Sequence, residues 1–245
     1  MISTTTIVLP AACSSDLGHR PQRLIRCRDV TLEITKVPNQ PATDRSIERL
    51  WHARGHKLVA GIDEVGRGPL AGPVVAAAVI LPEDDRLWFC DLRDSKMLTL
   101  LQRETLAERL RDEALAFGVG VVPSRRIDEI GIAPAAREAM RLAVLQLSPR
   151  PQALLLDAFA LPEVDLPQQP VVRGDATCCA IAAASIIAKV ARDRIMVGLE
   201  RRHPGYGFSH NRGYATAEHL EALQHMGPCP IHRYSFGPVN LAARG

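Results

Sequence analysis

The sequence contains no hydrophobic run long enough to cross a membrane. Its longest apolar stretch lies around residues 74–81, far short of the roughly 20 residues that a spanning helix needs. Residues 1–30 contain acidic and basic side chains and no continuous apolar core, so we expect no secretory signal. These absences predict a protein of the cytoplasm that does not enter a membrane.

The six cysteines include no Cys-X-X-Cys pair, and the adjacent Cys178 and Cys179 are poorly placed to bridge each other. We therefore expect reduced, mostly buried thiols rather than a disulfide or zinc framework.

No charge of one sign dominates, and the net charge is only +3. Basic side chains outnumber acidic ones from residue 189 to the end, however, and most of the histidines lie there. This distribution suits a surface that meets phosphates, although a solvated basic face has the same composition. A length of 245 residues with 47% hydrophobic residues suits one sizeable globular domain.

The pattern along the chain predicts a short extension followed by one α/β domain. Residues 1–42 show no sustained period and read as a loosely ordered N-terminal extension, with residues 30–37 as a candidate edge strand. From residue 43 to 245, apolar runs with β-branched residues alternate with helical periodicity. We expect strands at 58–62, 73–81, 118–122 and 153–156, a short extended piece at 170–172, and helices at 44–53, 100–117, 132–147, 180–202 and 217–225. A capping box of Thr99 and Gln102 should begin the second helix. This alternation favours a central, partly parallel sheet flanked by helices, with a small C-terminal helical region.

Two of the expected strands run directly into acidic residues. Asp63 and Glu64 follow one apolar run, and Asp157 follows another. Ligands of open α/β sheets bind beyond such strand ends, although an aspartate there can also simply start a loop or cap a helix. If a fourth carboxylate such as Asp175 joins them, mutual repulsion demands protons or cations. Oxygen ligands without a nearby Cys or His pair favour two Mg²⁺ or Mn²⁺ ions flanking a phosphodiester.

An ordered set of motifs resembles the ribonuclease HII family. The opening signature is Gly61-Ile62-Asp63-Glu64-Val65-Gly66-Arg67-Gly68-Pro69-Leu70-Ala71-Gly72-Pro73, and it is followed by Asp94-Ser95-Lys96, Asp157, Gly174-Asp175, the helix segment 182–193, Gly213-Tyr214 and Ile231-His232-Arg233. The resemblance covers roughly residues 58–239. It implies an RNase H-like fold in a catalytic domain at 43–245, and a two-metal endonuclease acting on RNA–DNA hybrids and on ribonucleotides embedded in duplex DNA.

The resemblance also implies roles for individual residues. Asp63, Glu64, Asp157 and Asp175 would be the metal-binding catalytic carboxylates. Gly66-Arg67-Gly68 would read the ribose 2′-hydroxyl, the group that separates RNA from DNA, and Tyr214 would pack on the sugar beside the cut. We also expect phosphate contacts from basic and hydroxyl side chains at Lys96, Ser185, Lys189 and Arg212. Ala158 departs from the family, which often has glycine there.

The family's reaction would be hydrolysis 5′ to a ribonucleotide, leaving a 3′-hydroxyl and a 5′-phosphate, by a protein expected to be monomeric. Three other readings remain open from the residues alone. A histidine-driven ribonuclease using His210 and His232 would leave a cyclic phosphate. A hybrid-binding module without chemistry would gain nothing from the four carboxylates. A resolvase- or transposase-like nuclease would share the acidic site but would have no use for the glycine loop and Tyr214.

Overall fold

The computed structural model describes residues 43–244 of the chain. Its centre is a five-stranded sheet in the order β3-β2-β1-β4-β5. The first three strands are antiparallel neighbours, whereas β4 lies parallel to both β1 and β5. The strands are β1 (Val59–Val65), β2 (Val74–Ile80), β3 (Ala116–Val122), β4 (Ala153–Asp157) and β5 (Gln168–Val171). The predicted mixed sheet is confirmed.

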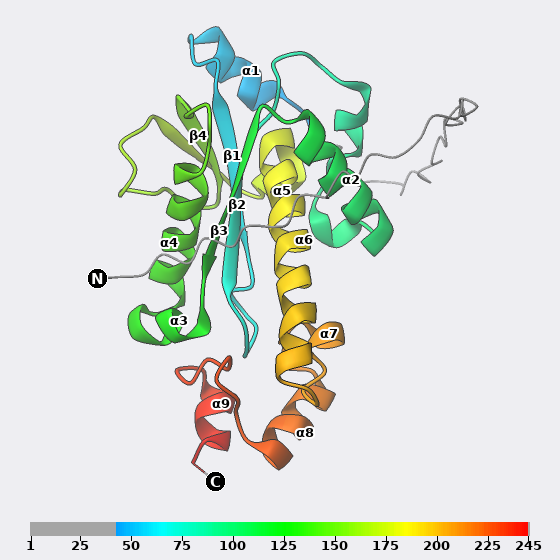
Figure 1. Ribbon diagram of the computed structural model, residues 1–245. Helices are drawn as coiled ribbons and strands as arrows, with labels where there is room; N and C mark the ends of the chain where they lie inside the picture. The colour runs from blue at the N-terminus through cyan, green and yellow to red at the C-terminus, as the bar shows by residue number, and fades with distance from the viewer. Residues whose placement is uncertain (1–42, 245) are drawn as a thin grey trace, which may run out of the picture. The chain divides into compact units, whose positions relative to one another are not determined.

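Helices cover both faces of this sheet (Figure 1). The long α6 packs on β1 and β2 and contacts α2, whereas α4 packs on the other face over β2 and β3. The helices are α1 (Ser46–Ala53), α2 (Leu100–Glu113), α3 (Ser124–Ile130), α4 (Ile132–Leu145), α5 (Gly174–Thr177), α6 (Cys179–Arg202), α7 (Phe208–Asn211), α8 (Ala217–Met226) and α9 (Gly237–Ala242), with two 3-10 turns at Leu87–Asp91 and Ser95–Met97. The last three helices form the expected C-terminal helical region.

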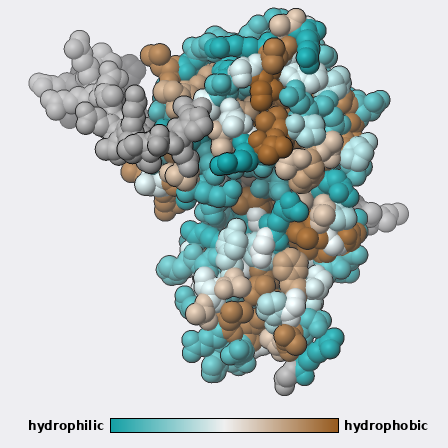
Figure 2. Space-filling view, turned by 180° about the vertical axis from the view of Figure 1, so that it is seen from behind, coloured by the Kyte–Doolittle hydropathy of each residue, from teal (hydrophilic) through white to brown (hydrophobic). Residues whose placement is uncertain are grey.

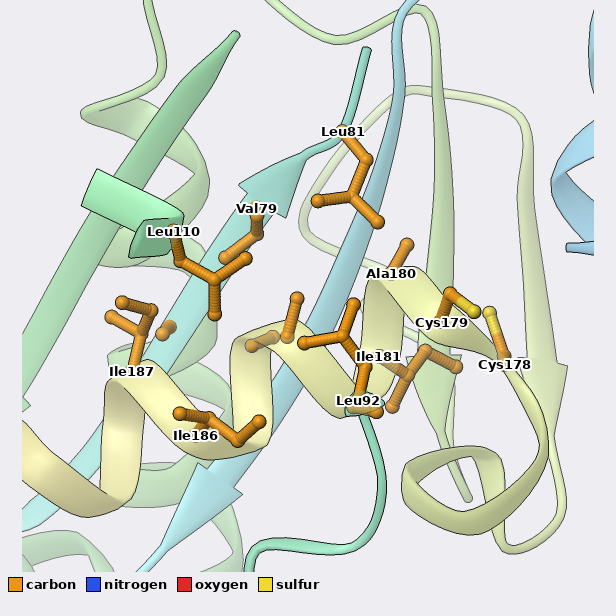
Figure 3. Packing of buried hydrophobic residues seen from close by; sticks show 14 of the residues in the cluster. Val79, Leu81, Leu92, Leu110, Cys178, Cys179, Ala180, Ile181, Ile186 and Ile187 are labelled. Atoms are coloured by element: carbon orange, nitrogen blue, oxygen red, sulfur yellow. The ribbon is translucent and has the colours of Figure 1, made fainter. Parts of the chain in front are cut away.

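The first turns of α6 lie unusually close to the sheet. A Cβ atom on Gly61 of β1 would come within 2.1 Å of the carbonyl carbon of Ala180, so only glycine allows this approach. Figure 3 shows Ala180 and Ile181 of α6 among the buried side chains Val79, Leu81 and Leu110. This close contact fixes the start of α6 against the strand that carries the acidic pair.

Side-chain alternation along β1 divides the core into two layers. Val59 belongs to the cluster under α6, whereas Ala60 and Ile62 belong to the cluster under α4. Successive side chains of a strand point to opposite faces. Asp63 therefore faces the α6 side and Glu64 faces the α4 side.

Most expected elements occur, with shifted ends. The capping box at Thr99 and Gln102 is present, but the helix stops at Glu113 because Ala116 and Phe117 pair with β2 as the start of β3. The prediction that the helix reaches residue 117 is wrong, and α3, α5, α7 and α9 were not predicted. The candidate strand at 30–37 lies outside the described residues.

The structure describes four of the six cysteines, and two of these four thiols are buried, whereas Cys90 is exposed and Cys229 is partly buried. Cys90, Cys178, Cys179 and Cys229 are all free, and the adjacent pair is buried. Cys13 and Cys27 lie outside the described residues.

Among residues 43–244 no helix is long and apolar enough to cross a bilayer. On the face drawn in Figure 2, hydrophobic residues form patches separated by hydrophilic surface.

Candidate active site

Asp63 and Glu64 lie within β1 rather than after it. The strand continues to Val65 because both residues pair with β2, Asp63 opposite Ala77 and Glu64 opposite Ala76. The expected strand end at residue 62 is thus wrong by three residues. The parallel ladder between β1 and β4 ends at the pair Ile62 and Leu156, so Asp63 and Asp157 follow as neighbours on adjacent strands.

A turn after β5 brings the fourth carboxylate to the same place. The amide of Gly174 donates to Asp157 Oδ1 at 2.8 Å, and Asp175 follows in the first turn of α5. Arg173, before this turn, has a φ of 55° in the left-handed region. The four predicted carboxylates therefore come together from β1, β4 and α5.

Burial is the main cause that raises the pKa of three of these acids, and the neighbouring carboxyls add to it. Burial, and then the neighbouring Glu64, raises the pKa of Asp63 well above its usual value, with smaller contributions from Asp157 and Asp175. Burial also raises the pKa of Glu64 to about 7, with Arg67 opposing the rise and Asp157 adding to it. The pKa of Asp157 is raised by burial and by Asp175, against the Gly174 hydrogen bond. Negative charge at this site is therefore costly without a cationic partner.

Two basic side chains, Lys96 and Arg67, lie within ion-pair distance of these acids. Lys96 Nζ lies 3.4 Å from Asp175 Oδ2 and 3.8 Å from Asp94 Oδ1. Arg67 lies 3.4 Å from Glu64 Oε1. Glu64 Oε2 is buried and has no hydrogen-bond partner among the described residues.

The carboxylates influence one another's pKa, but they do not surround a ready-made metal site. Within the described part of the chain, no three His, Cys, Asp or Glu side chains already stand in the arrangement of a metal cluster. This agrees with Asp63 and Glu64 facing opposite sides of the sheet. Even so, the all-oxygen donor set, the unsatisfied Glu64 oxygen and the raised pKa values fit hard divalent cations.

The glycine loop lies beside Tyr214. Gly66 has a φ of +93°, and a Cβ there would come within 2.2 Å of Arg192 Nε, so the position requires glycine. A Cβ on Gly68 would lie 3.8 Å from Cε1 of Tyr214. The Tyr214 side chain is 42% exposed. The loop and the tyrosine thus form one surface next to Glu64.

The four expected phosphate contacts divide into three environments. Lys96 is exposed next to Asp175. Lys189 and Arg212 both lie against Asp193, at 2.7 Å and 3.5 Å. Ser185 is buried, and its Oγ lies 3.0 Å from Ser95 Oγ, while its hydroxyl lowers the pKa of the neighbouring Asp63. A direct phosphate contact from Ser185 does not fit this burial.

The two histidines of the alternative ribonuclease mechanism lie in different environments. His210 is exposed and contacts Ser209. His232 is 1% exposed, and its Nε2 lies 3.0 Å from Nε2 of His219. Burial, together with His219, lowers the pKa of His232 to about 4. A buried imidazole with both nitrogens engaged cannot serve as the base for a substrate hydroxyl, and this argues against that mechanism.

A family model described as Ribonuclease HII matches residues 60–239. The chain belongs to the ribonuclease HII family. Enzymes of this family are endonucleases that hydrolyse RNA in RNA–DNA hybrids, and the resemblance of the motifs is confirmed.

Similar proteins align with this chain over most of their own length. A ribonuclease HII of Acetivibrio thermocellus is 52% identical over 223 residues, which cover 91% of this chain and 86% of the relative. The ribonuclease HII of Geobacillus kaustophilus is 48% identical over 242 residues, covering 95% and 92%. The crystal structure of ribonuclease H2 from Pyrococcus horikoshii OT3 superposes with a TM-score of 0.65 at 29% identity, covering 76% of this chain and 97% of that one. The expected RNase H-like fold is confirmed.

Three charged residues close to the candidate site were not predicted from the sequence. Arg192 and Arg233 are both 0% exposed, and Asp193 is 7% exposed. All three lie inside motifs that carry the family resemblance. A motif, however, does not tell a buried arginine from a phosphate-binding one.

Proposed function

We propose that this protein cuts on the 5′ side of a ribonucleotide, both in RNA–DNA hybrids and where a single ribonucleotide is embedded in duplex DNA. The proposal is supported by four carboxylates from β1, β4 and α5 whose charges act on one another. Of these, Glu64 lies beside Arg67 of the Gly66–Gly68 loop, and Tyr214 lies beside Gly68. The acids give a site for phosphodiester hydrolysis, and the loop and ring give a surface for reading the sugar.

Asp63, Glu64, Asp157 and Asp175 would hold two Mg²⁺ or Mn²⁺ ions. When bound, such ions activate a water molecule and stabilise the departing 3′ oxygen. The unpartnered Oε2 of Glu64 and the raised pKa values of three of the acids support this assignment. The buried Ser185 would orient Asp63 instead of touching the substrate.

The residues around the acids would bind and orient the nucleic acid. The exposed main chain at Arg67 and Gly68 can approach a ribose closely, because neither glycine of the loop carries a Cβ. The Arg67 side chain, within reach of Glu64, can also contact a phosphate. Tyr214 would pack on the neighbouring sugar. Lys96, Lys189 and Arg212 would meet strand phosphates, and Asp193 would hold the last two in place.

A duplex carrying one ribonucleotide, incubated with and without Mg²⁺ or Mn²⁺, tests this function. We expect metal-dependent cleavage that leaves a 3′-hydroxyl upstream and a 5′-phosphate on the ribonucleotide. Cyclic phosphate ends formed without metal would refute the proposal.

A further inference from the structure

Arg233 is fully buried, and its guanidinium lies 5.2 Å from the centre of the Phe236 ring. Within residues 43–244 its hydrogen bonds go only to main-chain carbonyls. Its Nε donates to Gly72 at 3.0 Å, its Nη1 to Arg67 at 2.9 Å and its Nη2 to Gly66 at 2.6 Å. Within residues 43–244 it has no carboxylate partner at ion-pair distance. Burial, and then the charge of Arg192, lowers its pKa to about 9. A buried charge needs its hydrogen bonds, because losing them would leave it uncompensated in the protein interior.

The hydrogen bonds from Arg233 determine the orientation of two peptide groups, the one between Gly66 and Arg67 and the one between Arg67 and Gly68. In a trans peptide, the carbonyl of one residue and the amide of the next point in opposite directions. Because the carbonyls of Gly66 and Arg67 point inward to the guanidinium, the amides of Arg67 and Gly68 point outward.

These two outward amides lie at the surface beside the acids. Arg67 and Gly68 are both exposed. In the described chain neither amide donates to another main-chain group. Glu64 lies on one side of them through its contact with Arg67, and the Tyr214 ring lies beside Gly68.

Glycines alone do not produce this arrangement. Gly66 and Gly68 free the loop to adopt many conformations, and Gly66 itself takes a positive φ. Arg192, the other buried arginine nearby, holds the carbonyls of Ala71 and Pro73 further along the loop. Arg233 is therefore the side chain that orients the two peptides next to the acids.

We propose that Arg233 is a positioning residue for sugar recognition: it presents the amides of Arg67 and Gly68 as a preorganised pair of donors to the ribose 2′-oxygen. This inference rests on the proposed function, because it names what orients the loop that reads the sugar. Arg233 does not touch the substrate itself.

The test compares Arg233→Lys with the matched variant Arg45→Lys. Arg45 is also buried and donates to two consecutive carbonyls, those of Glu83 and Asp84, in a loop that belongs to no part of the proposed site. Lysine keeps the charge but loses the planar fork. For each protein, KM is measured on a duplex with one ribonucleotide, and Ki is measured for the all-DNA duplex of the same sequence as a competitor.

In Arg233→Lys the ratio of Ki to KM should fall by roughly 5- to 100-fold, the value of two neutral hydrogen bonds, while Ki stays unchanged. In Arg45→Lys the ratio should equal that of the wild type. A purely structural role would reduce the active fraction and so kcat, but not this ratio. A wild-type preference kept intact by Arg233→Lys would overturn this inference alone. A wild-type ratio near one would overturn ribonucleotide recognition and this inference with it.

A second pair of variants covers the case in which Arg233→Lys does not fold. Arg67→Pro removes one of the two amides and leaves Arg233 in place, and Arg67→Ala removes the same side chain but keeps the amide. We expect Arg67→Pro to lose more of the ribonucleotide preference than Arg67→Ala, by about 2- to 10-fold for one hydrogen bond. Equal preference in the two variants would overturn the inference.

Discussion

Replacing Asp63 by asparagine should make the protein more stable and nearly inactive. Asp63 is 7% exposed, and burial and then Glu64 raise the pKa of its carboxyl. The folded protein thus disfavours the ionised form, which Asp157 and Asp175 also repel. Asparagine has nearly the same shape, keeps an oxygen that can accept from Ser185, and removes the charge.

The gain in stability follows from the electrostatics of the site. A like charge about 4 Å away costs about 4 kcal/mol at an effective dielectric constant near 20. Partial protonation of the acids relieves some of this repulsion in the wild type. We therefore expect Asp63→Asn to raise the free energy of unfolding by about 1 to 4 kcal/mol at pH 7 without divalent cations, measured by urea denaturation.

Activity should change in the opposite direction. Loss of one of the four carboxylates should lower kcat about 1000-fold, because several kcal/mol of transition-state stabilisation depend on the bound cations. Affinity for the hybrid should change little. Asp112→Asn, at an exposed carboxylate of α2, is the control and should leave stability and kcat unchanged. An Asp63→Asn protein that is less stable than the wild type and turns over normally would refute the reasoning.

The remaining predictions concern Gly61 of β1, Ala158, Tyr214 and the buried His232. Gly61→Ala should destabilise by about 2 kcal/mol or more in urea denaturation, because its Cβ would overlap the Ala180 carbonyl carbon; unchanged stability would contradict the close packing of α6. Ala158→Gly should stabilise by about 1 kcal/mol, since Ala158 has a φ of 66°; a decrease would show that the strain is absent. Tyr214→Ala should reduce kcat/KM at the RNA–DNA junction about tenfold by lost sugar packing, with little effect on thermal unfolding because the ring is 42% exposed; unchanged junction kinetics would remove its role. Burial lowers the folded-state pKa of His232 from 6.5 to about 4. Its contribution to the free energy of unfolding, at most about 3 kcal/mol, is therefore present above pH 6.5 and is lost as the pH falls toward 4. A His232→Gln protein with the same pH dependence of stability would contradict this.

The sequence predicted the two strands that carry Asp63 and Asp157 because their signal is local, whereas α5, which carries Asp175, was not predicted. An apolar run that ends in a carboxylate can be recognised without knowledge of the fold. Asp63 and Asp157 both follow such a run. The end of β1 was missed, because only the pairing of Asp63 and Glu64 with β2 extends the strand to Val65. Likewise, pairing of Ala116 with Ile80 ends α2 early.

The residues that support the site could not be predicted, because their roles depend on distant partners. Arg233 bonds to carbonyls more than 160 positions earlier in the chain. A phosphate contact was predicted for Ser185 from its place on a helix. In the fold, Ser95 and Asp63 lie against its hydroxyl instead. The sequence pattern of a basic or hydroxyl side chain is the same whether it faces solvent or the core.

The response of thermal unfolding to Mn²⁺ tests most directly whether the four acids form a cation site. A ligand that binds only the folded state raises its stability, by about 1.4 kcal/mol at ten times the Kd. We predict a saturable rise in the unfolding temperature of the wild type with Mn²⁺, and no such rise in Asp157→Asn. An equal rise in both proteins would contradict the account.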